Sequence, residues 1–168
     1  MAVPASDLPS DPDTEVVDAP MGPPTPALVR PVSLALVFVG GTLGTAGREA
    51  LTLLIPVSGG VPWAVLMANL VGAFALGVLL EALVHRGAGH GGRRTLRLLL
   101  GTGFLGGFTT YSALATDTAA LWGAGDAGLA TAYGLGTVVV GALTTTVGIL
   151  LASAACRSRS GAAGEVTG

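Results

Sequence analysis

The spacing of the charged residues constrains this chain more than any other feature of its sequence. Asp, Glu, Lys and Arg are absent from four long stretches, 31–47, 50–80, 98–116 and 127–156. An α-helix needs about 20 mostly apolar residues to cross the hydrocarbon core of a membrane, so each stretch is long enough or nearly so. Only 11% of the residues are charged, against about 25% in soluble domains. The pattern predicts an integral membrane protein rather than a soluble one.

The fold class that follows is all-α, with four transmembrane helices. We place them near 32–54, 62–84, 95–122 and 127–155. The polar residues inside these ranges are mostly Gly, Ser and Thr, with one Asn, which are typical of interfaces between membrane helices. A four-helix domain is therefore expected over 32–155. The segments 1–31, which holds five acids and eight prolines, and 156–168 are predicted to be disordered tails.

The basic residues predict how the chain is oriented. With four spans, both termini and the 85–97 loop share one side, and the turns 55–62 and 123–128 share the other. The first side carries every arginine except Arg48, and the second side carries no Lys or Arg. By the positive-inside rule, both termini are expected in the cytoplasm. We interpret the basic 85–97 loop as an anchor at the lipid surface of the cell membrane and expect no nucleic-acid partner.

The third predicted helix has the sequence that is least favourable to a helix. Gly106 and Gly107 are adjacent at mid-span, and threonines follow at positions 109 and 110. Each glycine costs about 1 kcal/mol in a helix interior, so we expect a break at mid-membrane. A break at that depth exposes peptide groups and is how membrane proteins build ion sites. A kinked helix that holds no ion is the alternative.

A break there defines a set of candidate site residues. The carbonyl oxygens of Gly106 and Thr109 are expected to face a small cation. Four side chains near the break are expected to face any permeating ion or solute: the hydroxyls of Thr109, Thr110 and Ser112 and the ring of Tyr111.

Three further polar positions lie in the other predicted helices. Asn69 has the only amide side chain in any span, so it serves either a pore or a hydrogen bond between helices. Arg48 continues the four-residue stripe of Gly40 and Gly44 near the outer edge of the core. Snorkelling to the interface and a vestibule for anions both fit that position. Thr137, one turn after Tyr133, belongs to a polar face of the fourth helix.

Three motifs in order resemble those of a known family, the small bacterial fluoride channels called CrcB or Fluc. They are Gly40-Gly41-Thr-Leu-Gly44 through Arg48, Asn69-Leu-Val-Gly72-Ala-Phe74 through Gly77, and Gly103-Phe-Leu-Gly106-Gly107-Phe-Thr109-Thr110-Tyr111-Ser112. The resemblance implies a passive channel that relieves cytoplasmic fluoride toxicity. It also implies an antiparallel dimer with two fluoride pathways and a central, structural sodium ion.

The resemblance also assigns roles by position. It implies that Asn69 lies by the pore, that the Gly106 and Thr109 carbonyls hold the sodium, that Thr110 and Ser112 belong to the polar lining, and that Tyr133 and Thr137 form its part in the fourth helix. Two features depart from the family. Phenylalanines are replaced by Tyr111 and Leu114, and the arginine bias favours a single orientation. The family includes paired genes whose products insert oppositely, so we expect a heterodimer with an oppositely oriented paralogous subunit.

Other functions remain as alternatives. A non-conducting accessory subunit of such a heterodimer is one, because Leu114 removes an aromatic ring. A coupled small-ion exporter is another, although it normally needs a carboxylate or His at mid-depth to carry protons, and we find none in the sequence. We do not expect an enzyme, because the sequence shows no nucleophile and base pair and no cluster of metal ligands.

Overall fold

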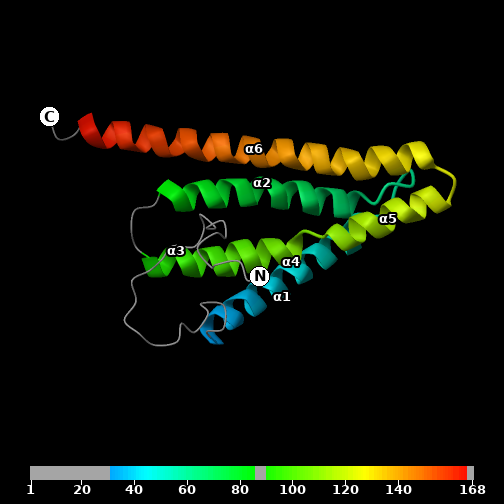
Figure 1. The fold of residues 1–168 in the computed structure, drawn as a ribbon, viewed down its shortest axis with the longest axis horizontal. Helices are drawn as coiled ribbons and strands as arrows, with labels where there is room; N and C mark the ends of the chain where they lie inside the picture. Colours follow the sequence, from blue (N-terminus) through cyan, green and yellow to red (C-terminus); the bar gives the residue numbers. More distant parts are fainter. Residues whose placement is uncertain (1–30, 86–89, 166–168) are drawn as a thin grey trace, which may run out of the picture.

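The computed structural model describes residues 31–85 and 90–165, and most of these residues are helical. The helices are α1 (Pro31–Leu54), α2 (Trp63–His85), α3 (His90–Leu96), η3 (Arg97–Leu105), α4 (Gly106–Phe108), α5 (Tyr111–Gly123) and α6 (Ala127–Glu165). The segment from α3 to α5 corresponds to the third predicted helix. In Figure 1, α6 lies along α2, and α1 crosses the segment formed by α3, η3 and α4 at an angle.

Most helix ends agree with the sequence prediction; the start of the third helix and the end of α6 differ. α1 and α2 begin and end within one residue of the predicted positions. The third helix begins at His90, five residues before the predicted 95, and α6 continues to Glu165, ten residues past 155. Helix outside the hydrocarbon core does not have to be apolar, so hydropathy gives no signal for these extensions. Residues 1–30 of the predicted N-terminal tail lie outside the described residues.

Among the described residues, three helical segments are long and apolar enough to cross a membrane by length and composition. They are Trp63–Val84, Gly92–Gly123 and Ala127–Ser158. α1, the remaining predicted span, has 24 residues but contains Arg48, Glu49 and several glycines and threonines. The chain is a small multi-pass membrane protein. Its apolar outer surface fits that class, since large side chains such as Phe38 (74% exposed) and Leu53 (79%) point outward.

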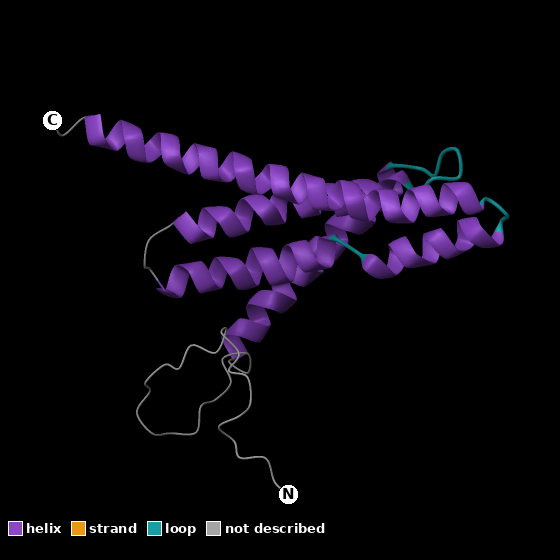
Figure 2. Cartoon of the chain, turned by 45° about the horizontal axis from the view of Figure 1, so that its top comes forward, coloured by secondary structure: helices purple, strands orange, loops and turns teal. Residues whose placement is uncertain are grey.

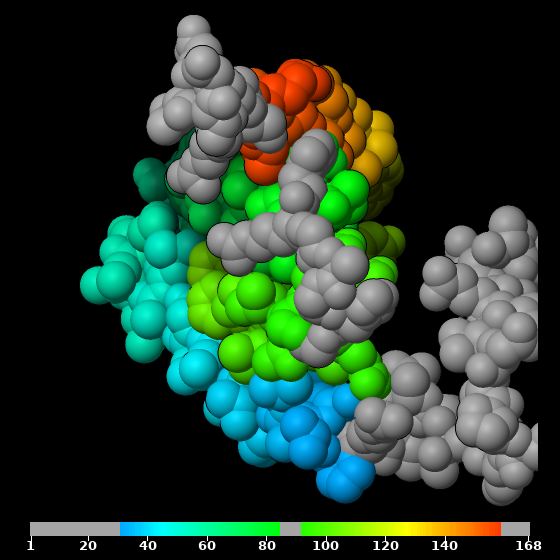
Figure 3. Space-filling view, turned by 90° about the vertical axis from the view of Figure 1, so that its left-hand side faces the viewer, coloured from blue at the N-terminus to red at the C-terminus, as the bar shows by residue number. Residues whose placement is uncertain are grey.

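The two tight turns of the bundle lie together at one end. Figures 1 and 2 show the turn between α1 and α2 beside the turn between α5 and α6, and the start of α1 and the end of α6 at the opposite end. Gly59 and Gly60 have positive φ values of 61° and 78°, and a β-bridge joins Ser58 to Val61. Figure 3 looks at the opposite end, where α6 (orange) and α1 (blue) lie on the two outer sides.

The third helix is broken, as predicted. η3 is a π-helix, in which the N–H of Gly106 donates to the carbonyl of Gly101 five residues earlier. The helix continues through Gly106 and Gly107 and ends at Phe108. Thr109 and Thr110 are extended, with ψ values of 154° and 120°. The break thus lies at the threonines of the predicted run, just after the glycine pair.

The glycines of this region serve close packing rather than the break. A Cβ added to Gly40 or Gly44 of α1 would strike backbone atoms of η3 and α4, with the Phe104 and Phe108 nitrogens both 2.9 Å away. A Cβ on Gly103 would lie 3.0 Å from the Gly40 Cα. The two backbones are in direct contact, which only small residues allow. The predicted glycine stripe of α1 is confirmed as a packing surface.

α2 and α6 are joined by a second set of small residues and by threonine hydroxyls. A Cβ on Gly77 would meet the backbone of Thr145, and one on Gly148 would lie 3.2 Å from the Val78 nitrogen. The Thr145 hydroxyl donates to the Ala73 carbonyl at 3.2 Å. These contacts hold α6 against α2 and fix one wall of the groove described below.

Candidate functional site

The break in the third helix is held by one side chain of α2. Asn69 Nδ2 donates to the Thr110 carbonyl at 3.0 Å, and the Thr110 N–H donates to Asn69 Oδ1 at 2.7 Å. Both polar atoms of the amide are thus paired with the backbone of one extended residue. An unpaired backbone group in a membrane costs several kcal/mol, so this pairing stabilises the extended conformation.

The same contacts release two carbonyl oxygens from regular helical bonding. In an unbroken α-helix, the Thr110 N–H would donate to the Gly106 carbonyl, but here it donates to Asn69. Likewise the Ala113 N–H donates to Thr110 Oγ1 at 3.2 Å rather than to the Thr109 carbonyl. Gly106 and Thr109 are the two residues whose carbonyls the sequence singled out. Each carbonyl oxygen has lost the donor that a continuous helix would supply.

A groove of about 380 Å³ opens beside the break. α2, η3, α4, α5 and α6 all contribute to its walls, and its lining includes these predicted site residues: Asn69, Gly106, Thr109, Thr110, Tyr111 and Thr137. The Tyr111 ring is 80% exposed. Ser112 does not line the groove, but its hydroxyl lies 3.1 Å from Thr110 Oγ1. The structure therefore gathers most of the candidates around one opening.

Tyr133 and Arg48 lie elsewhere. Tyr133 is only 5% exposed, belongs to the apolar core with Leu114 and Leu121, and donates its hydroxyl to Asp117 Oδ2 at 3.3 Å. Arg48 lies on α1 and does not line the groove. Its Nε is buried and finds no hydrogen-bond partner among the described residues. The roles expected for these two residues stay predictions.

Several residues of the groove were not among the sequence candidates. Gly72 touches Thr109, because an added Cβ would strike the threonine Cγ2 atom. Gly101, Gly141 and Thr145 also line the walls. By contrast, Thr137 was a sequence candidate. It is 4% exposed, and its hydroxyl donates to the Tyr133 carbonyl of its own helix, 2.6 Å away. The recurrence of small residues at four-residue steps was the one sequence signal for these walls, and it points equally to simple packing.

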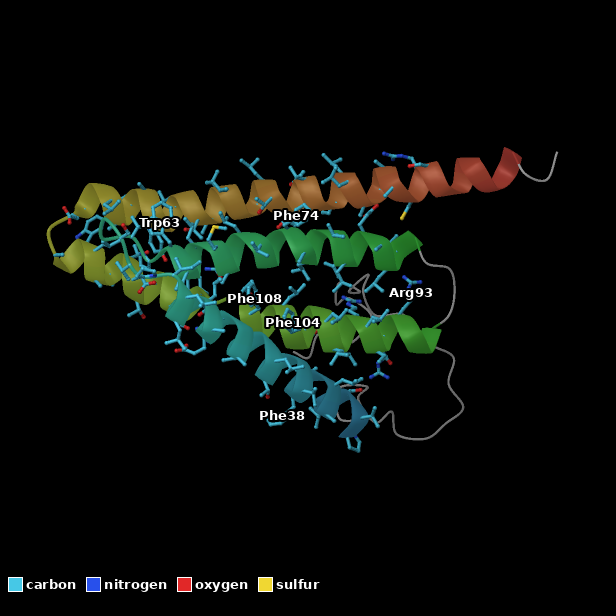
Figure 4. The ribbon with its side chains drawn as sticks, turned by 180° about the vertical axis from the view of Figure 1, so that it is seen from behind. Phe38, Trp63, Phe74, Arg93, Phe104 and Phe108 are labelled. Carbon is cyan, nitrogen blue, oxygen red and sulfur yellow. The ribbon has the colours of Figure 1, made fainter. Side chains whose placement is uncertain are left out.

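Leu114, at a position where the sequence resemblance implies a phenylalanine, is oriented inward. It is 6% exposed and reaches both the core cluster and the groove. Among the residues that the structure describes, the one close aromatic pair is Phe104 and Phe108, whose rings are 5.9 Å apart and nearly parallel. Figure 4 shows both rings on the third helix near its crossing with α1.

Comparisons with known proteins show which family this chain belongs to. A family profile described as "CrcB-like protein, Camphor Resistance (CrcB)" matches residues 35–149. The chain is 47% identical to "Fluoride-specific ion channel FluC 2" of Leifsonia xyli over 126 residues, which are 74% of this chain and 87% of the relative. It is 48% identical to "Fluoride-specific ion channel FluC 1" of Cutibacterium acnes, over 70% of this chain and 83% of the relative.

A more distant relative covers the same region. "Fluoride-specific ion channel FluC" of Paracoccus denitrificans is 40% identical over 114 residues, which are 67% of this chain and 88% of the relative. The family profile spans the whole of the groove and its break. This chain belongs to the CrcB/FluC family of fluoride channels.

Proposed function

We propose that this chain is a subunit of a passive, fluoride-selective channel that lets fluoride leave the cytoplasm and so relieves its toxicity. The relatives named above are fluoride-specific ion channels, and a channel of this kind is not an enzyme. The observation that carries the proposal is the break at Thr109 and Thr110. Asn69 holds this break through two hydrogen bonds to the Thr110 backbone, and the break opens to a groove. A continuous helix would offer no free peptide groups there.

The groove has the chemistry that a small anion requires. Fluoride is strongly hydrated, so a path for it must replace water with several close donors. The hydroxyls of Thr110 and Ser112 lie 3.1 Å apart at the break, and the exposed Tyr111 ring can add its positive edge. Among the groove's lining residues, none is acidic. The fluoride pathway of this subunit is therefore assigned to Asn69, Thr110, Tyr111 and Ser112, with Thr137 further along the groove.

The freed carbonyls fit a structural sodium ion. Oxygen atoms are the ligands that hard cations prefer, and Gly106 and Thr109 each present one that lacks its regular helical donor. One subunit supplies only part of a coordination shell, so a second subunit is needed to complete it. When bound, the sodium supplies a positive charge that favours an anion nearby.

The partner that we propose is an oppositely oriented paralogous subunit. The arginines of the described helices, Arg48 excepted, lie at the end of the bundle away from the tight turns: Arg93, Arg94, Arg97, Arg157 and Arg159. This bias favours one orientation, with both termini in the cytoplasm. An antiparallel dimer then requires a second chain with the opposite bias.

Asn69→Ala tests whether this subunit takes part in the pore. Co-expressed with its partner in a fluoride-sensitive bacterium, the wild-type chain is expected to restore growth in fluoride, and Asn69→Ala is expected to lose most of that rescue. Thr146→Ala is the matched control, because the exposed Thr146 hydroxyl bonds only to its own helix, at Ala142. Full rescue by Asn69→Ala would contradict a pore role.

A non-conducting accessory subunit is the second candidate. Leu114 favours it, because an aliphatic side chain occupies the position of a family phenylalanine and is buried. In that case the partner alone would line the active path. Unchanged rescue by Asn69→Ala, together with lost rescue when this chain is omitted, would favour this scaffold role.

A further inference from the structure

A second groove lies between α2 and the third helix and shares Leu105 with the groove at the break. Its volume is about 500 Å³. Its walls are wholly apolar: Phe74, Ala75, Val78, Leu79, Ala82, Leu83, Leu96, Leu100, Phe104 and Leu105. It extends from Phe74 near the middle of α2 to Leu83 near the end that carries the arginines. An apolar groove of this size on a membrane protein fits an extended hydrocarbon chain.

Two arginines of the third helix lie next to the end of the groove that Leu96 lines. Within α3, Arg93 precedes Leu96 by three residues, so the two lie on one face. Arg97 is the first residue of η3; it follows Arg93 by four residues, one turn further along that face. Arg97 is exposed and Arg93 is half-buried. Figure 4 shows Arg93 at the end of the third helix, beyond Phe104.

The neighbouring Arg94 is oriented differently. Its guanidinium donates to the hydroxyl of Ser33 at 3.2 Å, and Ser33 is a buried residue in the first turn of α1. Arg94 therefore joins the third helix to α1, on a different side from the groove. Of the three arginines on the third helix, Arg93 and Arg97 are therefore the two on the face that leads to the groove.

We propose that this groove binds an anionic phospholipid of the leaflet at the arginine-bearing end, with one acyl chain between α2 and η3 and the phosphate at Arg93 and Arg97. We choose an anionic phospholipid as the occupant because its charge is complementary to that of the two arginines. Guanidinium groups bind phosphate through paired hydrogen bonds, and none of the residues lining the groove is acidic. The lipid would brace α2 against the π-helix. The inference does not depend on which ion the channel conducts.

Native mass spectrometry of the purified full chain tests this binding. With equal amounts of phosphatidylglycerol and phosphatidylcholine added in detergent, we expect the chain to retain phosphatidylglycerol preferentially. The double variant R93Q/R97Q is expected to lower that retention about tenfold or more, because each basic residue near the surface contributes a several-fold gain in affinity for anionic lipid. The matched control is Arg157→Gln, which removes an exposed arginine at the same end of the bundle but on α6.

Two further variants distinguish lipid binding from a folding defect and from a protein subunit that covers the groove. R93K/R97K keeps the charge and is expected to keep most of the binding, which guards against a folding defect in the glutamine variant. Ala82→Trp fills the groove and is expected to release the lipid, while the variant still co-purifies with its co-expressed partner subunit. Equal retention of both lipids, or an equal loss in Arg157→Gln, would overturn the proposal. Loss of that co-purification in Ala82→Trp would also overturn it, since a protein subunit would then cover the groove.

Discussion

Thr110 carries more of the site's local structure than any other residue. Its backbone pairs with Asn69 through both polar groups, and its hydroxyl accepts from the Ala113 N–H as the N-cap of α5. The same hydroxyl lies within hydrogen-bonding distance of Ser112. One residue thus begins α5, holds the extended break and contributes to the polar lining.

Thr110→Val keeps the shape of the side chain and removes its hydroxyl. The loss of an N-cap costs about 0.5–2 kcal/mol, so we expect a lower thermal midpoint in detergent and slower fluoride flux. Thr110→Ser keeps the hydroxyl and is expected to stay close to the wild type in both measurements. A valine variant with unaltered melting and flux would show that the cap does not hold the break.

The sequence predicted these residue roles unevenly. Asn69, Gly106, Thr109 and Thr110 were identified because an amide and a run of poor helix formers stand out inside a membrane span. The Asp117 and Tyr133 contact was not predicted, because the two side chains belong to different helices. No periodicity within one helix reports how two helices are rotated against each other.

At the scale of the elements, the close contact between α1 and the π-helix determines where the groove lies. Gly44→Ala would place a methyl group against the Phe104 and Phe108 backbones, which cannot yield without separating the helices. We expect a loss of about 1–3 kcal/mol in chemical unfolding, with reduced flux. Gly136→Ala in α6 is the control, since its Cβ meets nothing within 4 Å.

The contrast between these two glycines is the informative result. Alanine is favoured over glycine by about 1 kcal/mol in a helix interior, so Gly136→Ala is expected to be neutral or slightly stabilising. Equal effects of the two substitutions would mean that helix propensity, rather than backbone contact, determines the stability of this region.

The elements show where sequence reasoning succeeds and where it fails. The apolar runs predicted all four helical segments, because membrane thickness imposes a minimum length on each. The break was expected in the run of poor helix formers from Gly106 to Thr110; within that run the glycines stay helical, and Gly107 packs on Gly41. Tertiary contact overrode propensity, and the break moved to the residue that Asn69 can reach.

At the scale of the whole molecule, the arginine bias predicts a single orientation. In a Cys156→Ser background, Ala124→Cys and Ser158→Cys place exposed thiols at opposite ends of the bundle. A membrane-impermeant maleimide added to intact cells is expected to label Ala124→Cys, and Ser158→Cys only after lysis. Equal labelling of both variants in intact cells would contradict a fixed orientation and favour a self-pairing dimer.

In the function proposed above, this chain forms half of a passive fluoride pathway. The direct measurement is fluoride release from liposomes, followed with a fluoride electrode, where the only driving force is the fluoride gradient and a potassium ionophore balances charge. We predict rapid release when this chain is reconstituted with its partner and little release with this chain alone. Release that requires an imposed proton gradient would contradict a passive channel. Equally rapid release from this chain alone would contradict the need for a second subunit.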